Sequence, residues 1–498
     1  MSTADFLATM LSKSGRIALM SARKLNISNE EAVRHAVRHM QAQRLGRPFY
    51  YGETRYEVTQ PSSRRNCVAL HENILAYVRS PVGGGHEVAV RDLITGDERT
   101  YCGEARENIK RIALTGRLLA FANEEGTLYV ADFQEPGPPI RLLMPSANVM
   151  YLTADGDTVA LIAAARRATY LWSCRTKRLH VCPFATQTAQ GQDSAGRYDV
   201  PLLSCTLRVD AEIGTLDVFS DYRGNGPLDG SKVADPDGDS PNMFYCIGHM
   251  RFDISGNYST TVPLTPICSS ILEFQTGQKA YIFLTGLQSI DMDGSYRMQI
   301  DTYDAPSRRP STDREWSQNK SIIFDSKSAG MRLERHHLPF PAITPDFKKE
   351  FVFSGRLLRW KNGYHSVFSD AEALTTFSEV GDGTEGPKKQ MKYQGTLSLY
   401  ERAKPGGRRS LAAFMNDRYL IVSAENTHTQ IPGQARILVI CFDEYTKLAG
   451  GHITGFWPSQ GKENRSPLDR TSTEHLVIRY WPARDHVLPF EQLGQPLL

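Results

Sequence analysis

Three stretches of sequence decide the fold of this chain. They are ILAYVRS (74–80) continued by HEVAVRDLITGDE (86–98), LLAFANEEGTLYVADFQEPGP (118–138) and TVALIAAARRATYLWSCRTKR (158–178). Each combines an apolar segment that contains Ala, a short link, a second segment of alternating character, a closing polar residue and another turn. Short apolar runs that are cut by Gly, Asp and Pro are typical of strands and turns. The three stretches therefore predict a repeated pair of neighbouring strands.

The repeat has a nearly constant length. Its alanines are 44 and 40 residues apart, and its closing polar residues are 40 and 41 residues apart. The alanines are Ala76, Ala120 and Ala160, and the polar residues are Asp92, Asp132 and Ser173. A period of about 40 residues with several strands per unit is typical of a β-propeller, whose blades stack around a ring because one blade cannot bury both of its faces alone. We therefore predict an all-β fold, a β-propeller over residues 56–482.

The predicted ring has seven or eight blades, with six as the alternative, once polar insertions between the strands are subtracted. Val130 and Trp172 are expected to be buried at equivalent places in successive blades. We expect Gly126 to supply the positive φ of a hairpin turn.

An open ring would leave unpaired strand edges that invite aggregation. We therefore expect one blade to be completed by strands from both ends of the chain: Cys67–Leu70, or alternatively Tyr56–Val58, together with His475–Trp481.

The segment before residue 56 differs from the rest and contains ISNEEAVRHAVRHMQAQRLGRP (27–48). Ser28 is a favourable N-cap, and carboxylates in the first turn complement the helix dipole. Gly46 and Pro48 would end the helix. Apolar residues recur at helical spacing between these limits: Ala32, Val33, Ala36, Val37 and Met40. We predict a short α-helical N-terminal arm over residues 1–55, and a C-terminal tail over residues 483–498.

Composition excludes several classes of function. The formal net charge of +3 gives no electrostatic case for nucleic acid or an anionic membrane. No apolar run approaches the roughly 20 residues of a membrane-spanning helix. The eight cysteines stand singly without a C-x-x-C pair, which fits a reducing compartment, the cytosol or the nucleus. The basic residues 1–24 overlap in composition with mitochondrial transit peptides, which is the alternative localisation.

Two groups of residues have the spacing of metal ligands. Asp235, Asp237 and Asp239 resemble the start of a calcium loop, but Cys246 stands where an EF-hand needs its last carboxylate. We interpret this group as a solvated turn.

The second group is His35 and His39, which are four residues apart in the predicted helix. They lack the glutamate of the H-E-x-x-H zinc motif. We interpret this part of the helix as an exposed cationic face, because Arg34 and Arg38 stand beside the two histidines.

Motifs for catalysis and for nucleotide binding are missing. The sequence contains no G-x-S-x-G element, P-loop or dinucleotide fingerprint, and Gly83–Gly85 is interpreted as a hairpin tip between two strands. We assign no catalytic, cofactor-binding or metal-ligating residue, and we expect no cofactor.

A basic helix followed by ENILAYV…HEVAVRDLITGDE and NIKRIALTGRLLAFANEEGTLYVADF resembles the propeller region of fungal F-box proteins. The resemblance is clear over residues 30–180 and looser beyond them. It implies a WD-repeat-like propeller that binds substrate, and an F-box that docks on the linker subunit of a cullin–RING ubiquitin ligase. The segment before Ser28 is too short for a whole F-box, so the box is incomplete or missing.

We expect a non-catalytic protein–protein interaction propeller, and as its specific form a substrate receptor of a ubiquitin ligase. Its partners would be other proteins, including the ligase linker subunit and a substrate, with no membrane or nucleic-acid partner, and the chain would be a monomer. The alternative is a propeller hydrolase or lyase with its site in the central channel.

Overall fold

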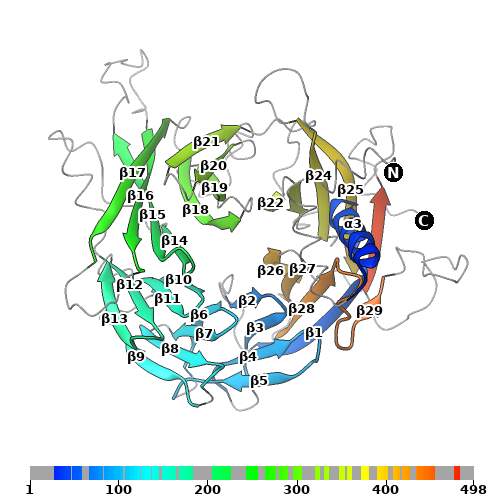
Figure 1. Ribbon diagram of the computed structural model, residues 1–498, viewed down its shortest axis with the longest axis horizontal. Helices are drawn as coiled ribbons and strands as arrows, with labels where there is room; N and C mark the ends of the chain where they lie inside the picture. The colour runs from blue at the N-terminus through cyan, green and yellow to red at the C-terminus, as the bar shows by residue number, and fades with distance from the viewer. Residues whose placement is uncertain are drawn as a thin grey trace, which may run out of the picture.

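A computed structural model of the chain shows strands arranged around a ring, with a helix at the periphery (Figure 1). The structure describes residues 27–45, 47–58, 67–81, 84–104, 107–123, 125–135, 137–144, 149–163, 168–182, 205–225, 243–255, 264–275, 280–289, 295–304, 320–325, 330–335, 347–353, 356–361, 372–380, 390–401, 408–415, 418–426, 433–454 and 476–482. Within these residues the strands form seven antiparallel sheets. The fold is therefore the predicted all-β propeller with a short N-terminal helix.

The first four sheets each consist of four strands in chain order. The first contains β2 (Val68–His71), β3 (Ile74–Arg79), β4 (Glu87–Asp92) and β5 (Glu98–Tyr101). The second contains β6 (Ile109–Leu114), β7 (Leu118–Asn123), β8 (Thr127–Asp132) and β9 (Ile140–Leu143). The third contains β10 (Val149–Asp155), β11 (Thr158–Ala163), β12 (Ala168–Ser173) and β13 (Arg178–Cys182). The fourth contains β14 (Cys205–Asp210), β15 (Thr215–Asn225), β16 (Met243–Asp253) and β17 (Pro266–Gln275).

The fifth sheet also has four strands, and the sixth and seventh sheets have five. The fifth sheet contains β18 (Ala280–Ser289), β19 (Ser295–Asp304), β20 (Lys320–Asp325) and β21 (Gly330–Arg335). The sixth contains β22 (Phe347–Phe353), β23 (Arg356–Lys361), β24 (Glu372–Val380), β25 (Gln390–Glu401) and β30 (Leu476–Pro482). The seventh contains β26 (Arg408–Met415), β27 (Tyr419–Asn426), β28 (Gly433–Cys441), β1 (Tyr50–Val58) and β29 (His452–Ile453).

The ring is closed by the N-terminal strand β1. It pairs with β28 along its whole length, from Tyr50 opposite Cys441 to Val58 opposite Gly433. The alternative candidate Tyr56–Val58 is therefore part of the closing strand. The candidate Cys67–Leu70 belongs to the first sheet instead, because Cys67 directly precedes β2 and the other three residues lie in it.

The C-terminal half of the predicted seam is wrong. Strand β30 pairs with β25 and covers the outer edge of the sixth sheet. The seventh sheet does not need it, because β1 already occupies the edge of β28.

The repeat in the sequence corresponds to the second and third strands of each sheet. The polar residue that ends the third strand accepts a hydrogen bond from the backbone N–H two residues later, which fixes the following turn. The donor–acceptor distances are 2.7 Å for Asp92, 2.9 Å for Asp132 and 3.3 Å for Ser173. Asp253 does the same in the fourth sheet, at 2.9 Å. In the seventh sheet Asp443, two residues after the end of β28, accepts a hydrogen bond from the N–H of Tyr445 at 3.0 Å. The spacing of these residues thus reflects a recurrent turn.

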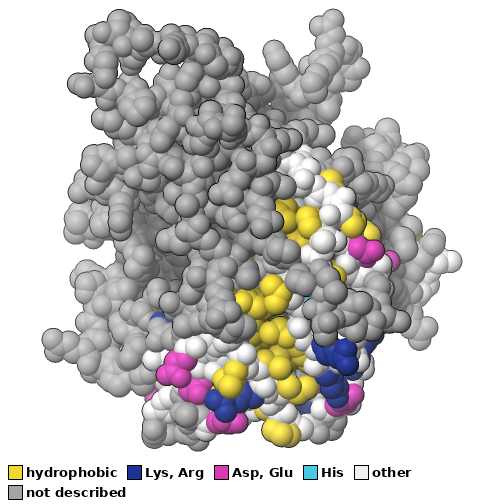
Figure 2. Space-filling model, turned by 90° about the vertical axis from the view of Figure 1, so that its left-hand side faces the viewer, with side chains coloured by type: hydrophobic (Ala, Val, Ile, Leu, Met, Phe, Trp, Pro, Cys, Tyr) yellow, Lys and Arg dark blue, Asp and Glu magenta, His cyan; other side chains and the backbone are white. Residues whose placement is uncertain are grey.

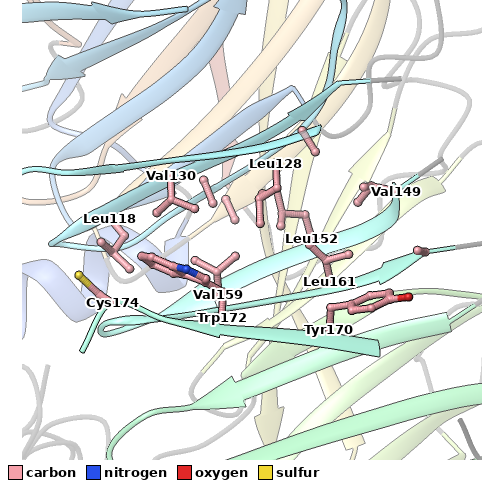
Figure 3. Packing of buried hydrophobic residues seen from close by; sticks show 14 residues of the cluster. Leu118, Leu128, Val130, Val149, Leu152, Val159, Leu161, Tyr170, Trp172 and Cys174 are labelled. Carbon is pink, nitrogen blue, oxygen red and sulfur yellow. The ribbon is translucent and has the colours of Figure 1, made fainter. Parts of the chain in front are cut away.

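The core lies between neighbouring sheets. Val130 and Trp172 are both 1% exposed, which confirms that they are buried. They are not equivalent, however, because the repeat alanine Ala120 pairs with Val130, whereas Ala160 pairs with Leu171. Successive residues of a strand point to opposite faces. Trp172 therefore faces back toward the second sheet, where it belongs to the same apolar cluster as Val130 (Figure 3).

Gly126 has a φ of 87° in the link between β7 and β8, as the sequence predicted. Gly84 and Gly85, with φ values of 89° and 79°, lie in the link between β3 and β4, which agrees with a hairpin tip. Both links need the left-handed region that glycine adopts without a steric penalty.

The predicted helix is α3 (Asn29–Leu45). Ser28 caps it reciprocally: its Oγ accepts a hydrogen bond from the N–H of Glu31 at 3.2 Å, and its own N–H donates to the Glu31 carboxylate at 3.1 Å. The helix lies against the sixth sheet, at β24 and β25, and contacts the segment after β28. No helix among the described residues is long and apolar enough to cross a bilayer.

Candidate functional site

The two histidines of α3 face the protein rather than solvent. Nε2 of His35 lies 2.8 Å from Oδ1 of Asp443, and both side chains are buried. Nδ1 of His39 donates to the carbonyl oxygen of Phe442 at 3.1 Å, with the tautomer that this acceptor requires. In the described part of the chain, no three His, Cys, Asp or Glu side chains are grouped as a metal site needs. The two histidines thus hold the helix on the ring.

The predicted cationic face of α3 is therefore only partly correct. Arg34 is exposed and pairs with Glu30 on the helix itself. Arg38 instead pairs with Glu444 at 2.5 Å, and its guanidinium lies over the ring of Phe49. The small residues Ala32 and Ala36 belong to the predicted apolar pattern and are buried, which lets the helix approach closely. Apolar periodicity did not reveal that His35 and His39 lie on the same buried face.

The turn residue Asp443 is the anchor of this contact. Burial alone would raise the pKa of its carboxyl group, but hydrogen bonds from His35 and Thr446 and the nearby imidazoles outweigh burial. The pKa of Asp443 consequently lies below its ordinary value. Asp443 therefore shapes the turn after β28 and also binds the N-terminal helix.

The acidic group Asp235, Asp237 and Asp239 lies outside the described residues. The described cysteines differ in exposure. Cys67, Cys174, Cys182 and Cys441 are buried, whereas Cys102 is exposed.

A polar network that the sequence search missed crosses the fourth sheet. Nε2 of His249 lies 2.8 Å from Oδ1 of Asp217, and its Nδ1 lies 3.3 Å from Oγ of Ser270. The three residues come from β15, β16 and β17, and His249 stands directly opposite Ser270 in the strand register. Only the pairing of the strands brings them together, so no spacing in the sequence could reveal them. A serine, a histidine and an aspartate in this order are the components of a nucleophilic triad.

The surroundings of the network favour a structural role. Asp217 also accepts two hydrogen bonds from Arg251, at 2.7 and 3.1 Å, and Arg208 lies 3.5 Å away. The imidazole of His249 stacks on Phe219 and contacts Phe324 of the fifth sheet. Burial would raise the pKa of Asp217, but its hydrogen bonds outweigh burial and the pKa is lowered.

Two consequences follow from this geometry. The carboxylate of Asp217 is hydrogen-bonded to the guanidinium of Arg251 as well as to His249. It therefore does not interact solely with the imidazole whose positive charge a triad aspartate stabilises. The aspartate, the histidine and the serine lie in the second to fourth strands of the sheet, whereas β14, the strand nearest the centre of the ring, contributes Arg208 (Figure 1). The network therefore differs from the central-channel site that the hydrolase alternative requires.

An exposed apolar surface lies on the outer strands. Leu143 of β9 is 70% exposed, Val181 of β13 is 41% exposed and Ile267 of β17 is 63% exposed. The three strands belong to consecutive sheets and follow one another along the outside of the ring (Figure 1). Figure 2 shows hydrophobic side chains gathered on the described part of this side, bordered by basic side chains. Apolar side chains that gather on a surface mark interaction sites more often than scattered ones.

This surface was also missed by the sequence search. Each of its residues is a single apolar side chain in a short strand of mixed polarity, such as RLHVC in β13. The exposed and half-buried positions of that strand can be told apart only when its sheet is known.

The chain was compared with known proteins. No family model matches the sequence, and no curated protein matches it. A chain in the crystal structure of a mitotic checkpoint complex is 9% identical, with 78% of this chain and 91% of that chain covered and a TM-score of 0.40. BamB from Moraxella catarrhalis is 9% identical, with 77% and 98% covered and a TM-score of 0.36.

The β-propeller domain of the Trilobed protease from Pyrococcus furiosus is 11% identical, with 80% and 99% covered and a TM-score of 0.38. The fold assignment rests on the strand order and register of the chain itself, which make it a β-propeller protein whose seventh sheet is completed by its N-terminal strand.

Proposed function

We propose that the chain is a non-catalytic propeller that binds other proteins, and that the outer side of its second to fourth sheets is a binding surface. The observation that carries the proposal is the exposure of Leu143, Val181 and Ile267 on three consecutive outer strands. Leaving such side chains in water forgoes roughly 1.5–3 kcal/mol for each one that could be fully buried. A protein partner that covers them would recover part of this free energy.

As a more specific form of this function, we propose a substrate receptor of a cullin–RING ubiquitin ligase in the cytosol or nucleus. Its support is the resemblance of residues 30–180 to fungal F-box propellers. The segment before Ser28 would contact the linker subunit, and residues 1–26 lie outside the described part of the chain.

The test is affinity purification from the native cells with the tagged full chain and with a variant carrying Leu143→Ser, Val181→Ser and Ile267→Ser. A partner retained by the unchanged chain and lost with the variant supports the binding surface. An equal set of partners for both chains would overturn it. Co-purification of cullin and linker subunits distinguishes the ligase receptor from other interaction propellers, and their absence would remove that specific form only.

One observation favours a second candidate function, a hydrolase whose site lies in the fourth sheet and not in the central channel: the contact of Ser270 with His249 and of His249 with Asp217. It predicts covalent labelling of Ser270 by a fluorophosphonate probe. The non-catalytic proposal predicts none.

A further inference from the structure

The segment that enters β17 contains a threonine directly before a proline, in the sequence PLTP (263–266). The full sequence has five Ser-Pro or Thr-Pro steps, which begin at Ser80, Ser240, Thr265, Thr344 and Ser466. Only Thr265 also has a proline two residues before it. Proline-directed protein kinases select a hydroxyl that a proline follows directly, and many of them favour a further proline at that earlier position. The sequence therefore makes Thr265 the candidate acceptor for such a kinase.

Exposure separates the two of these steps that the structure describes. Thr265 and Pro266 are exposed. Ser80 is only 3% exposed, and its N–H donates to the carbonyl oxygen of Glu57 at 2.9 Å. The other three hydroxyls lie outside the described residues. A kinase must align the acceptor oxygen with the γ-phosphate of ATP, which a buried hydroxyl cannot reach without local unfolding. The structure therefore favours Thr265 over Ser80 as an acceptor.

Backbone pairing is weak directly after the threonine. Pro266 lies opposite Phe252 but has no N–H to donate. Ile267 has no partner in the strand register, because Cys268 is already opposite Arg251, and this is the pattern of a β-bulge. Among the described residues β17 is also the last strand of its sheet, so it pairs on one side only.

Before the threonine the segment is anchored. Leu264 packs against the apolar cluster between the third and fourth sheets, and its N–H donates to the carbonyl oxygen of Val181 at 3.2 Å. Thr265, Pro266 and Ile267 then form an exposed stretch that is anchored at one end and weakly paired at the other. Edge segments with few hydrogen bonds and little buried apolar surface open at a low cost in free energy. A kinase can therefore bind this stretch in an extended form without unfolding the sheet.

A phosphate on Thr265 would lie within the exposed apolar surface of the outer strands. The hydrogen bond between Leu264 and Val181 places Thr265 one residue from the contact with β13, and Ile267 follows two residues later. Phosphothreonine carries a charge of roughly −1.5 to −2 at pH 7, and burying it in an apolar interface requires that this charge be dehydrated. Modification of Thr265 therefore opposes the binding of a partner that covers Val181 and Ile267.

We propose that Thr265 is a phosphorylation site for a proline-directed protein kinase, and that its phosphate weakens protein binding to the outer side of the third and fourth sheets. In the reaction, Oγ of Thr265 attacks the γ-phosphorus of ATP. The new O–P bond forms as the bond between this phosphorus and the bridging oxygen breaks, ADP leaves, and the hydroxyl proton passes to the catalytic aspartate of the kinase. The effect on binding rests on the proposed function, whereas the site does not.

The first experiment treats the purified full chain with Mg²⁺, ATP and each of two proline-directed kinases, a mitogen-activated one and a cyclin-dependent one. Peptide mass spectrometry should locate a phosphate on Thr265. The modification should be absent in Thr265→Val, and Pro266→Ala should slow it by at least about tenfold, because the kinase selects the proline. An unmodified Thr265 with both kinases, or equal rates for Pro266→Ala and the unchanged chain, would overturn the proposal.

Ser80 is the control within the same chain, because it also precedes a proline but is buried. In the folded chain Ser80 should carry at least about tenfold less phosphate than Thr265, since its hydroxyl is reached only after local opening. Ser80→Ala should leave the phosphate on Thr265 unchanged. Comparable phosphate on Ser80 and Thr265 would show that exposure does not select the acceptor.

The second experiment uses the partner that the unchanged chain retains and that the Leu143→Ser, Val181→Ser and Ile267→Ser variant loses. The tagged chain is treated with the kinase, with or without ATP, before it meets desalted cell extract. Treatment with ATP should reduce the retained partner by at least about fivefold, because the phosphate must be dehydrated on binding. The same treatment of Thr265→Val should leave the partner retained.

The outcomes separate this proposal from the proposed function. Equal retention with and without phosphate on Thr265 would overturn the effect on binding and leave the proposed function intact. If no partner depends on Leu143, Val181 and Ile267, the proposed function fails and the effect on binding fails with it. The phosphate on Thr265 is measured without any partner and stands or falls by the first experiment.

Discussion

His35 of the N-terminal helix and Asp443 of the last sheet form a buried pair, with 2.8 Å between Nε2 and Oδ1. The pair connects α3, which directly precedes the closing strand β1, to the turn that directly follows its partner strand β28. The pair therefore joins the N-terminal helix to the two strands that close the ring. The first prediction concerns this pair.

Replacing His35 with Ala should lower the free energy of unfolding by about 1–3 kcal/mol, because a buried carboxylate loses a hydrogen-bond donor. Urea unfolding followed by tryptophan fluorescence measures the change. Arg34→Ala is the control, because this side chain is exposed on the same helix and should change stability by less than about 0.5 kcal/mol. Equal effects of the two substitutions would contradict the role of the pair.

The same pair predicts a dependence on pH. The pKa of Asp443 is lower in the folded chain than in the unfolded chain, so its stabilising contribution is present above the ordinary carboxyl pKa of about 3.9. That contribution is lost as the pH falls from there toward the lower folded value. In His35→Ala the pKa of Asp443 should rise toward its ordinary value. The loss of stability with acid between about pH 5 and pH 2 should then be shallower than in the unchanged chain.

The second prediction concerns the seam. A chain that lacks β1 (Tyr50–Val58) should lose the edge of β28 and the contributions of Tyr50 and Tyr56 to the apolar cluster between the first and seventh sheets. Its Tm should fall by roughly 10 °C or more, since several kcal/mol are lost. A peptide with the sequence of β1 should restore part of the Tm.

Truncation after Glu474 is the matched comparison, because it removes β30 and leaves the seventh sheet intact. Its Tm should fall less than that of the chain without β1. A larger fall after the C-terminal truncation would show that β30, and not β1, is the strand on which the ring depends.

The sequence predicted the parts of the fold whose residues carry a local signal. The second and third strands, such as LLAFAN and TLYVAD in the second sheet, are buried almost throughout and are therefore rich in apolar residues. The turn residues Asp92 and Asp132 and the capping residue Ser28 also act on neighbours within a few positions. Their roles could be predicted because the interactions are local.

The remaining features depend on contacts between distant residues. Outer strands such as β5 and β9 are mostly exposed or half-buried, so their composition does not separate them from loops. The pairing of Tyr50 with Cys441 depends on how many sheets the ring contains, which a degenerate repeat does not fix. The contact of His249 with Asp217 similarly depends on the register of long strands. The apolar surface around Val181 could not be predicted for the same reason.

The third prediction concerns Trp172, whose indole Nε1 is buried and has no hydrogen-bond partner among the residues that the structure describes. Trp172→Ala should cost about 3–5 kcal/mol by cavity formation between the second and third sheets. Trp172→Phe removes no hydrogen bond and keeps an aromatic ring, so it should cost less than about 1.5 kcal/mol. Equilibrium unfolding of both variants measures the difference. Similar losses for Phe and Ala would indicate that the indole N–H is satisfied in solution.

The last prediction separates a structural role of the fourth-sheet network from a catalytic one. His249→Ala should cost about 2–4 kcal/mol, because it removes a buried ring that stacks on Phe219 and a hydrogen bond to Asp217. Ser270→Ala should change stability by less than about 1 kcal/mol, because Ser270 is only half-buried and its contact with His249 is long.

A structural network also predicts no covalent labelling of Ser270 by a fluorophosphonate probe, followed by mass spectrometry of the intact chain. Asp217 is already held by Arg251, so an imidazolium at His249 would gain less stabilisation from the carboxylate than in a dedicated triad. Labelling that disappears in both Ser270→Ala and a folded His249→Gln variant would reverse this conclusion. It would assign a nucleophilic role to a serine of β17, the strand that also carries the exposed Ile267.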